Sequence, residues 1–238
     1  MGESKAAYEH WHARLEVDDQ ADTPWHRLVR DYLTDEELRT ASVLEIGCGR
    51  GGFACWLASQ SSRPKVIVAA DFAETAVEKG RSFAREHGIL GIEWRVADIQ
   101  KLAFRDSSFD LVISCETIEH VPEPKVAIRE LARVLRPGGR LIVTTPNYFG
   151  PMGLYRAYRR VVGRPFTEEG QPINHLMMLP VTRSWVKRSG LRVIRTDGVG
   201  HYLPFPGRVP IRLHVLDRLR PLTCWFGLHS ALVAEKPV

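Results

Sequence analysis

The sequence predicts an α/β fold built around a mostly parallel sheet. Short apolar runs recur between residues 43 and 145, and each is followed by a turn and a segment with helical periodicity. Such alternation is the pattern of strand–helix–strand units. The clearest unit opens with the strand Val43–Ile46, passes through the glycine turn Gly47–Gly52 and continues as a helix from Phe53. Glycine is needed where the backbone takes a positive φ or where a ligand approaches the main chain closely.

Composition bounds the class of protein. The chain has 238 residues, 44% hydrophobic and 26% charged, which fits one globular domain over 1–238. The polar N-terminus and the lack of a bilayer-spanning apolar run lead us to expect a cytoplasmic protein. The four cysteines form no Cys-x-x-Cys pair, so neither a zinc knuckle nor a redox motif is indicated.

Two helices are expected before the first strand, at Tyr8–Val17 and Pro24–Leu38. Thr23 is a suitable N-cap for the second, because proline follows it at the first helical position. We expect residues 1–40 to form an N-terminal helical cover. Aromatic residues in it, Tyr8, Trp11 and Trp25, are interpreted mainly as packing residues.

The remaining elements follow in order. The predicted strands are Val43–Ile46, Val66–Ala70, Ile92–Val96, Phe109–Ser114, Arg140–Thr145, Leu191–Thr196 and His229–Glu235. The predicted helices after the glycine turn begin at Phe53 and then cover Ala73–His87, Pro124–Leu135, Met152–Val162, Pro180–Ser189 and Pro210–Arg220, with a turn at Arg136–Gly139. The alternation breaks after Asn147, so residues 148–178 are interpreted as an insertion on the substrate side.

Acidic residues stand at the carboxyl ends of the first two predicted strands. A Gly-x-Gly-x-x-Gly turn alone fits dinucleotide binding as well as other ligands. Glu45, however, stands two residues before Gly47, where it favours a cation and would repel a pyrophosphate. Asp71 lies 20 positions beyond Gly51. It is placed either to bind ribose hydroxyls or to cap the next helix, and both roles are compatible.

The pattern Glu45-x-Gly47-x-Gly49-x-Gly51 closely resembles the motif of class I S-adenosylmethionine (SAM)-dependent methyltransferases. The phrase VLRPGGRLIVTTPN, residues 134–147, is also typical of that family. The resemblance implies a Rossmann-like sheet of seven strands in the order 3-2-1-4-5-7-6, with helices on both faces and an antiparallel last strand. It implies methyl transfer from SAM, leaving S-adenosylhomocysteine. The implied cofactor-binding residues are Glu45, Gly47, Cys48, Gly49, Gly51, Asp71, Phe72, Asp98, Ile99 and Cys115.

A second motif follows the fourth strand. Glu116, Glu119 and His120 form Glu-x-x-Glu-His, and on one helical turn these side chains would share a face. Ubiquinone-biosynthesis O-methyltransferases and plant small-RNA 2′-O-methyltransferases carry the same motif and use a metal. The resemblance therefore implies a Mg²⁺ site formed by Glu116, Glu119 and His120, completed by His175. For the histidine that completes the metal site, His201 is the second choice after His175. The alternative is a structural segment without metal, with His120 or His175 as general base.

The expected acceptor is a small molecule, methylated on a hydroxyl. Metal-independent N- or C-methylation and RNA 2′-O-methylation are the alternatives. Residues 1–150 hold 19 basic and 23 acidic residues, a net of −4, whereas 151–238 hold 14 and 5, a net of +9. The basic third suits an anionic substrate, RNA or a membrane surface. DNA is not expected, and the lack of a recognised RNA-binding module argues against RNA. The residues expected to form an apolar acceptor pocket are Tyr148, Phe149, Tyr155, Phe166, Met177 and Met178.

Overall fold

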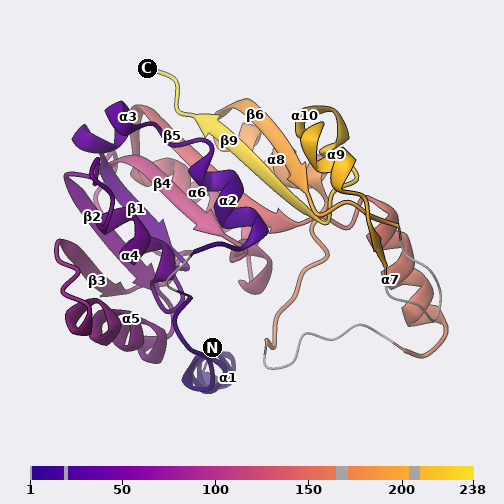
Figure 1. The fold of residues 1–238 in the computed structure, drawn as a ribbon, viewed down its shortest axis with the longest axis horizontal. Coiled ribbons are helices and arrows are strands. Elements are labelled where there is room, and N and C mark those ends of the chain that lie inside the picture. The colour runs from indigo at the N-terminus through magenta and orange to yellow at the C-terminus, as the bar shows by residue number, and fades with distance from the viewer. Residues whose placement is uncertain (1, 19–20, 165–170, 204–209) are drawn as a thin grey trace.

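A seven-stranded sheet runs through the centre of the computed structural model, which describes residues 2–18, 21–164, 171–203 and 210–238 (Figure 1). Its strands are β1 (Ser42–Ile46), β2 (Val66–Asp71), β3 (Ile92–Val96), β4 (Phe109–Cys115), β5 (Leu135–Pro146), β6 (Arg192–Val199) and β9 (His229–Glu235). Their order is β3-β2-β1-β4-β5-β9-β6, and β9 pairs antiparallel with both β5 and β6. This confirms the predicted order, because β9 is the seventh strand of the sheet. The short strands β7 (Tyr202–Leu203) and β8 (Ile211–Arg212) pair separately.

Helices flank both faces of this sheet. They are α1 (Gly2–Ala13), α2 (Pro24–Arg30), α3 (Asp35–Thr40), α4 (Gly52–Ala58), α5 (Glu74–Glu86), α6 (Pro124–Val134), α7 (Pro151–Val161), α8 (Leu179–Arg188), α9 (His214–Arg218) and α10 (Arg220–Thr223). A single 3₁₀ turn covers Ile118–His120. None of the helices in the described ranges is long and apolar enough to cross a bilayer.

The N-terminal helices differ from their predicted bounds. The first begins earlier and ends at Ala13, because cations of the domain bind the following carbonyls: Lys79 donates to Ala13 and Leu15, and Arg50 donates to Glu16. The second predicted helix, Pro24–Leu38, is divided into α2 and α3. The Thr34 hydroxyl accepts the backbone N–H of Glu37 and starts a new helix there.

Two C-terminal predictions are also corrected. The segment Pro210–Arg220 is not one helix but β8, α9 and the start of α10. The predicted turn Arg136–Gly139 belongs to β5, which begins at Leu135. A register shift between Phe109 and Leu111 of β4 accommodates these residues beside the sheet, and Gly138 takes a φ of +78°.

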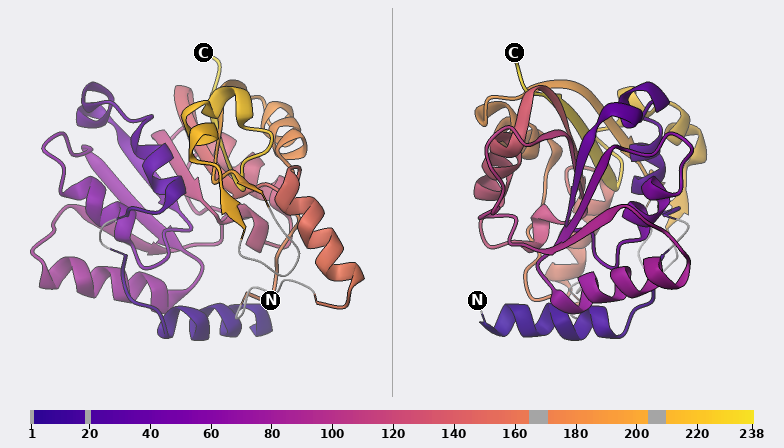
Figure 2. Two further views of the ribbon diagram at one scale, coloured as in Figure 1. Left: turned by 45° about the vertical axis from the view of Figure 1, so that its right-hand side comes forward. Right: turned by 90° about the vertical axis from the view of Figure 1, so that its left-hand side faces the viewer.

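The core consists of two apolar layers, one on each face of the sheet (Figure 2). Alternate residues of a strand point to opposite faces. Thus Val43 packs with Leu28 of α2 and Phe53 of α4, whereas Leu44 belongs to the layer containing Leu131 of α6 and Val186 of α8. Because both faces are covered, the loops at the strand ends provide the place for a ligand.

Candidate active site

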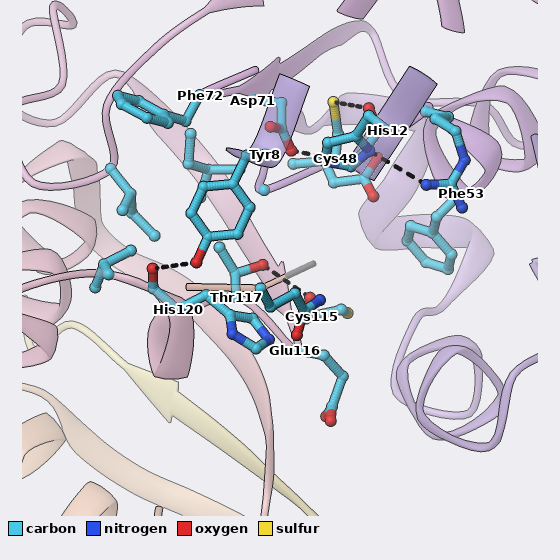
Figure 3. A pocket seen from close by; sticks show the side chains of 18 of the residues that line it. Tyr8, His12, Cys48, Phe53, Asp71, Phe72, Cys115, Glu116, Thr117 and His120 are labelled. Carbon is cyan, nitrogen blue, oxygen red and sulfur yellow. Dashed lines mark hydrogen bonds between the residues drawn. The ribbon is translucent and has the colours of Figure 1, made fainter. Parts of the chain in front are cut away.

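A cavity of about 330 Å³ lies where β1, β2 and β4 end, and Figure 3 shows it from close by. The sheet supplies its floor through residues that follow these strands. Helix α1 lies across this edge, as Figure 1 also shows. The Tyr8 hydroxyl donates to the carbonyl of His120 at 3.0 Å, and the Glu9 carboxylate accepts the N–H groups of Glu74 and Thr75 at the start of α5. The cavity is therefore covered by the N-terminal segment.

The glycine turn brings the backbone close to neighbouring loops. Gly47 has a φ of +73°, and a Cβ there would lie 2.2 Å from the Thr117 hydroxyl oxygen. At Gly52 a Cβ would lie 1.9 Å from the carbonyl oxygen of Asp18. Both positions therefore require glycine, the first for its conformation and for space, the second for space alone. The turn is held to β2 by the N–H of Gly47, which donates to Ala70 at 2.8 Å.

Glu45 lies beneath the turn and is 3% exposed. Its Oε2 atom is buried and has no hydrogen-bond partner among the described residues. Burial, together with the nearby Asp71 carboxylate, raises the pKa of Glu45 to about 8. A buried carboxyl with an unused oxygen beside a cavity fits a ligand that carries positive charge, because a cation would stabilise its ionised form.

Asp71 links the second strand to the turn. One carboxylate oxygen accepts the N–H of Gly49 at 2.8 Å, and the other accepts the N–H of Ala73 at 2.9 Å. The second bond holds the backbone just before α5. Asp71 therefore supports the start of this helix, but the N-cap residue itself is Ala73. Each oxygen retains a lone pair, so hydroxyl groups of a ligand still have acceptors here.

The remaining predicted cofactor residues also reach the cavity. Asp98, after β3, accepts the N–H of Gln100 at 2.8 Å and lines the cavity beside the buried Ile99. Phe72, Cys48 and Cys115 line it as well. Burial raises the pKa of both thiols well above the usual value, so they remain protonated near neutral pH. Of the predicted set, Gly51 alone is not a lining residue; it begins α4 with a φ of +75°.

Several lining residues come from the N-terminal segments and were interpreted as packing or not considered. They are Tyr8, Trp11, His12, Trp25 and His26. His12 Nδ1 lies 3.2 Å from Nη1 of Arg50, and burial lowers the pKa of His12. Burial also lowers the pKa of His26 to about 4, and its ring stacks on Phe53 at 5.1 Å. Only the aromatic content of residues 8–26 pointed to these residues.

The predicted metal ligands do not converge. Glu116, Glu119 and His120 do not share a helical turn, because the 3₁₀ helix begins only at Ile118 and Glu116 has a φ of +47°. His120 donates from Nδ1 to the carbonyl of Ile173 at 2.8 Å, and His175 from Nε2 to that of Val121 at 2.9 Å. In the part of the chain that the structure describes, no group of three or more His, Cys, Asp or Glu residues is arranged to hold a metal. These residues do not fit a Mg²⁺ site.

The other histidines have distinct environments. His201 is 1% exposed, with Nδ1 at 2.7 Å from Asp217 and Nε2 at 3.0 Å from the carbonyl of Thr223, so both ring nitrogens have structural partners. His229, which sequence reasoning did not consider, contacts the Glu116 carboxylate through Nδ1 at 2.9 Å. In Figure 3 the Glu116 side chain extends away from Asp71 and His12.

The acceptor pocket expected from residues 148–178 is not formed by the residues named for it. Met177 is buried in the core, and Phe149 is half exposed against Trp225. The Arg156 guanidinium lies over the Tyr148 ring and donates a hydrogen bond to its hydroxyl. Phe166 lies outside the described residues. None of the other five residues, all within the described ranges, lines the cavity. From the same segment, Gln171 and Ile173 do line it.

Part of this chain is similar in sequence to known proteins. Residues 44–143 match a family model described as a methyltransferase domain. A fatty-acid O-methyltransferase of Mycolicibacterium smegmatis is 40% identical over 108 residues, 44% of this chain and 38% of that protein. A ubiquinone biosynthesis O-methyltransferase of Xanthomonas euvesicatoria is 37% identical over 112 residues, 47% of this chain and 45% of that protein. The matched segments thus span less than half the length of these two relatives.

Similarity of fold extends over nearly the whole chain. The crystal structure of a SAM-dependent methyltransferase from Mesorhizobium loti superposes with a TM-score of 0.65 and 17% identity, covering 90% of this chain and 99% of that one. At this identity the superposition supports the fold alone. Residues 44–143 therefore resemble the methyltransferase domain family, and the described part of the chain has the fold of SAM-dependent methyltransferases.

Proposed function

We propose that this protein transfers the methyl group of SAM to an oxygen atom of a small molecule. The observation that carries the proposal is the buried Glu45 carboxyl, whose Oε2 atom has no partner among the described residues and borders the covered cavity. Its neighbours Asp71 and Asp98 supply further acceptors at the ends of β2 and β3. These carboxyl groups can balance a positive charge and accept hydrogen bonds, so they suit a molecule with a cationic end and a nucleoside.

When bound, SAM supplies a methyl group activated by its sulfonium. In the proposal, Glu45 compensates positive charge beneath the glycine turn, and Asp71 accepts hydroxyl groups while its bond to Gly49 N–H keeps the turn in place. Asp98 and Ile99 hold the base, one by hydrogen bonding and one by packing. Helix α1 limits access of water. The rate gain would come mainly from holding two reactants together in an enclosed space.

The acceptor class is supported by the cavity wall. Trp25, His26 and Phe53 line the cavity, and the His26 ring stacks on Phe53. Such an aromatic wall suits an apolar or aromatic molecule. Relatives named as a fatty-acid O-methyltransferase, a probable tocopherol O-methyltransferase and a ubiquinone biosynthesis O-methyltransferase favour oxygen as the acceptor atom. Metal assistance is left out of the proposal, since the residues expected to bind Mg²⁺ do not converge.

The test is transfer of tritium from methyl-labelled SAM to catechol, hexadecanoate, ethanolamine and a short RNA, each with Mg²⁺ and with EDTA. Label on an oxygen acceptor, equal in both buffers, supports the proposal. Label only on the amine or RNA, or none at all, contradicts it. The Asp98→Ala variant should lose transfer, whereas Asp106→Ala, at a largely exposed site on the β3–β4 connection, should retain it.

A second proposal concerns the surface of α7. Leu154, Tyr158 and Val161 recur at helical spacing and are 76%, 46% and 86% exposed. Residues 148–164 contain four arginines and no acidic residue. We propose that this helix contacts an anionic lipid surface, to which an apolar stripe beside positive charge is complementary. Figure 2 shows α7 projecting from the body of the sheet.

A further inference from the structure

A carboxylate–imidazole pair lies at the edge of the sheet that holds the cavity. Glu116 follows the last residue of β4, and His229 is the first residue of β9. Because β9 runs antiparallel to the strands beside it, its first residue lies at their carboxyl ends, opposite Pro146 of β5. Nδ1 of His229 and Oε2 of Glu116 are 2.9 Å apart. The two side chains are 16% and 14% exposed, so they are shielded but accessible.

The environment fixes the orientation of the imidazole. The His229 ring packs against Trp25 with ring centroids 4.8 Å apart, and Trp25 and Glu116 both line the cavity. The backbone N–H of Glu116 donates to the carbonyl of Thr144 at 3.0 Å. Its φ of +47° is a conformation that non-glycine residues rarely adopt and that is concentrated at functional sites. Glu116 is thus held in a strained position that directs its carboxylate to His229.

The pairing also sets the tautomer. An ionised carboxylate only accepts hydrogen bonds, so Nδ1 of His229 carries the proton that it donates to Glu116. In the neutral ring the lone pair then lies on Nε2. Nε2 of His229 has no hydrogen-bond partner in the described ranges, and it is not among the fully buried atoms. The neutral ring therefore has an accessible lone pair on Nε2, which a general base needs in order to accept a proton.

The histidines that line the cavity, His12, His26 and His120, lack this arrangement, whereas His229 adjoins the cavity through its contacts with Trp25 and Glu116. His120 has an acceptor near each nitrogen: the Ile173 carbonyl at 2.8 Å from Nδ1 and the Glu119 carboxylate at 3.6 Å from Nε2. Nδ1 of His12 faces the Arg50 guanidinium, a donor, at 3.2 Å. Nδ1 of His26 is buried without a partner, and no carboxylate orients its ring. Only for His229, among the described residues, does a hydrogen-bonded carboxylate fix the ring while the second nitrogen remains accessible.

We propose that His229, positioned by Glu116, is the general base of this site, and that the acceptor is a neutral hydroxyl, such as a phenol or an alcohol, rather than a carboxylate. This proposal rests on the proposed function. The hydroxyl proton moves to Nε2 of His229 while the oxygen bonds to the methyl carbon. The carbon–sulfur bond breaks, and its electron pair remains on the sulfur of S-adenosylhomocysteine. Glu116 stabilises the resulting imidazolium. A carboxylate acceptor is already ionised near neutral pH and needs no base.

The first test reads the ring directly and needs no acceptor. Nitrogen NMR of the protein with ¹⁵N-labelled histidine, saturated with S-adenosylhomocysteine, reports which ring nitrogen of His229 is protonated. We expect protonated Nδ1 and unprotonated Nε2 in the neutral ring, and loss of this preference in Glu116→Ala. A neutral ring protonated on Nε2 in the unsubstituted protein would overturn the proposal. Glu116→Gln, which retains the side-chain length, serves if the alanine variant does not fold.

The second test compares label transfer to catechol and to hexadecanoate. His229→Gln should lower kcat for catechol by about 100-fold or more, the usual contribution of a general base, with unchanged affinity for S-adenosylhomocysteine. Glu116→Gln should lower it by about 10-fold or more. His214→Gln, at an exposed position on α9, is the matched control and should have no effect. Full activity of His229→Gln, or label on hexadecanoate alone, would refute the proposal that His229 acts as general base for a hydroxyl acceptor. If the unsubstituted protein does not bind S-adenosylhomocysteine, the proposed cofactor site is refuted instead.

Discussion

The buried carboxyl of Glu45 makes a prediction about stability that needs no ligand. Its pKa is about 8 in the folded protein and 4.5 in the reference state. Between these values the unfolded chain has lost the Glu45 proton while the folded protein retains it. The folded state therefore binds more protons, and the free energy of unfolding falls as pH rises. The contribution is fully present below the lower pKa and is lost as pH rises through the upper one.

The magnitude follows from the size of the shift. Each pH unit between the two pKa values corresponds to about 1.4 kcal/mol. Integrated from pH 5 to pH 8, Glu45 should reduce the stability of the protein by about 3 kcal/mol. Glu45→Gln has nearly the same shape and no proton to lose. Its unfolding free energy should therefore gain about 3 kcal/mol relative to the unsubstituted protein over that pH range.

Urea denaturation of both proteins at pH 5, 6.5 and 8, without cofactor, measures this difference. The exposed Glu86→Gln on α5 is the control and should follow the unsubstituted protein at every pH. The expected result is a gap between Glu45→Gln and the unsubstituted protein that grows steadily with pH. If the free energies of unfolding of the two proteins change in parallel with pH, Glu45 is ionised in the folded protein throughout. The argument that the buried carboxyl favours a cationic ligand would then fail.

Three further predictions follow from single contacts. Gly47→Ala should destabilise the protein by about 1–3 kcal/mol in urea, because its Cβ meets Thr117 at a positive φ; a Thr117→Gly partner substitution should recover part of this loss, and no recovery would contradict the contact. Tyr8→Phe removes the bond to the His120 carbonyl, so amide exchange in α1 should accelerate by about 5-fold while global stability is retained; unchanged exchange would show that the hydroxyl does not hold α1. Leu154→Glu should weaken co-sedimentation with phosphatidylglycerol vesicles but leave label transfer to a soluble acceptor intact; unchanged sedimentation would refute the α7 surface.

Much of the sheet and many of the residues at the cofactor end of the cavity could be predicted, because the sequence patterns that indicate them are local. A strand, a glycine turn and a helix succeed each other within residues 43–58, and acidic residues stand at the carboxyl ends of β1 and β2 and just after β3. Parallel strands end at a common edge, so Glu45, Asp71 and Asp98 had to lie near one another once the sheet was recognised. Gly47 requires its residue type for reasons that the sequence already indicated.

The acceptor side could not be predicted, because its contacts join distant segments without a repeating pattern. Glu116 and His229 are 113 positions apart and meet only through the register of β9 on β5. Helix α1 is held by single bonds such as that of the Tyr8 hydroxyl to a backbone carbonyl, which no periodicity reports. The Glu-x-x-Glu-His motif was misleading because its helical spacing assumed an α-helix, whereas the segment is a short 3₁₀ turn.

The most direct test of the cofactor site is calorimetric titration of S-adenosylhomocysteine into the purified protein, with Asp71→Asn in parallel. The account predicts one site of about micromolar affinity, weakened at least 10-fold in Asp71→Asn, because the substitution removes the ionised acceptor that also holds the Gly49 N–H. The absence of binding to the unsubstituted protein, or equal affinity of the two proteins, would contradict the placement of SAM in this cavity.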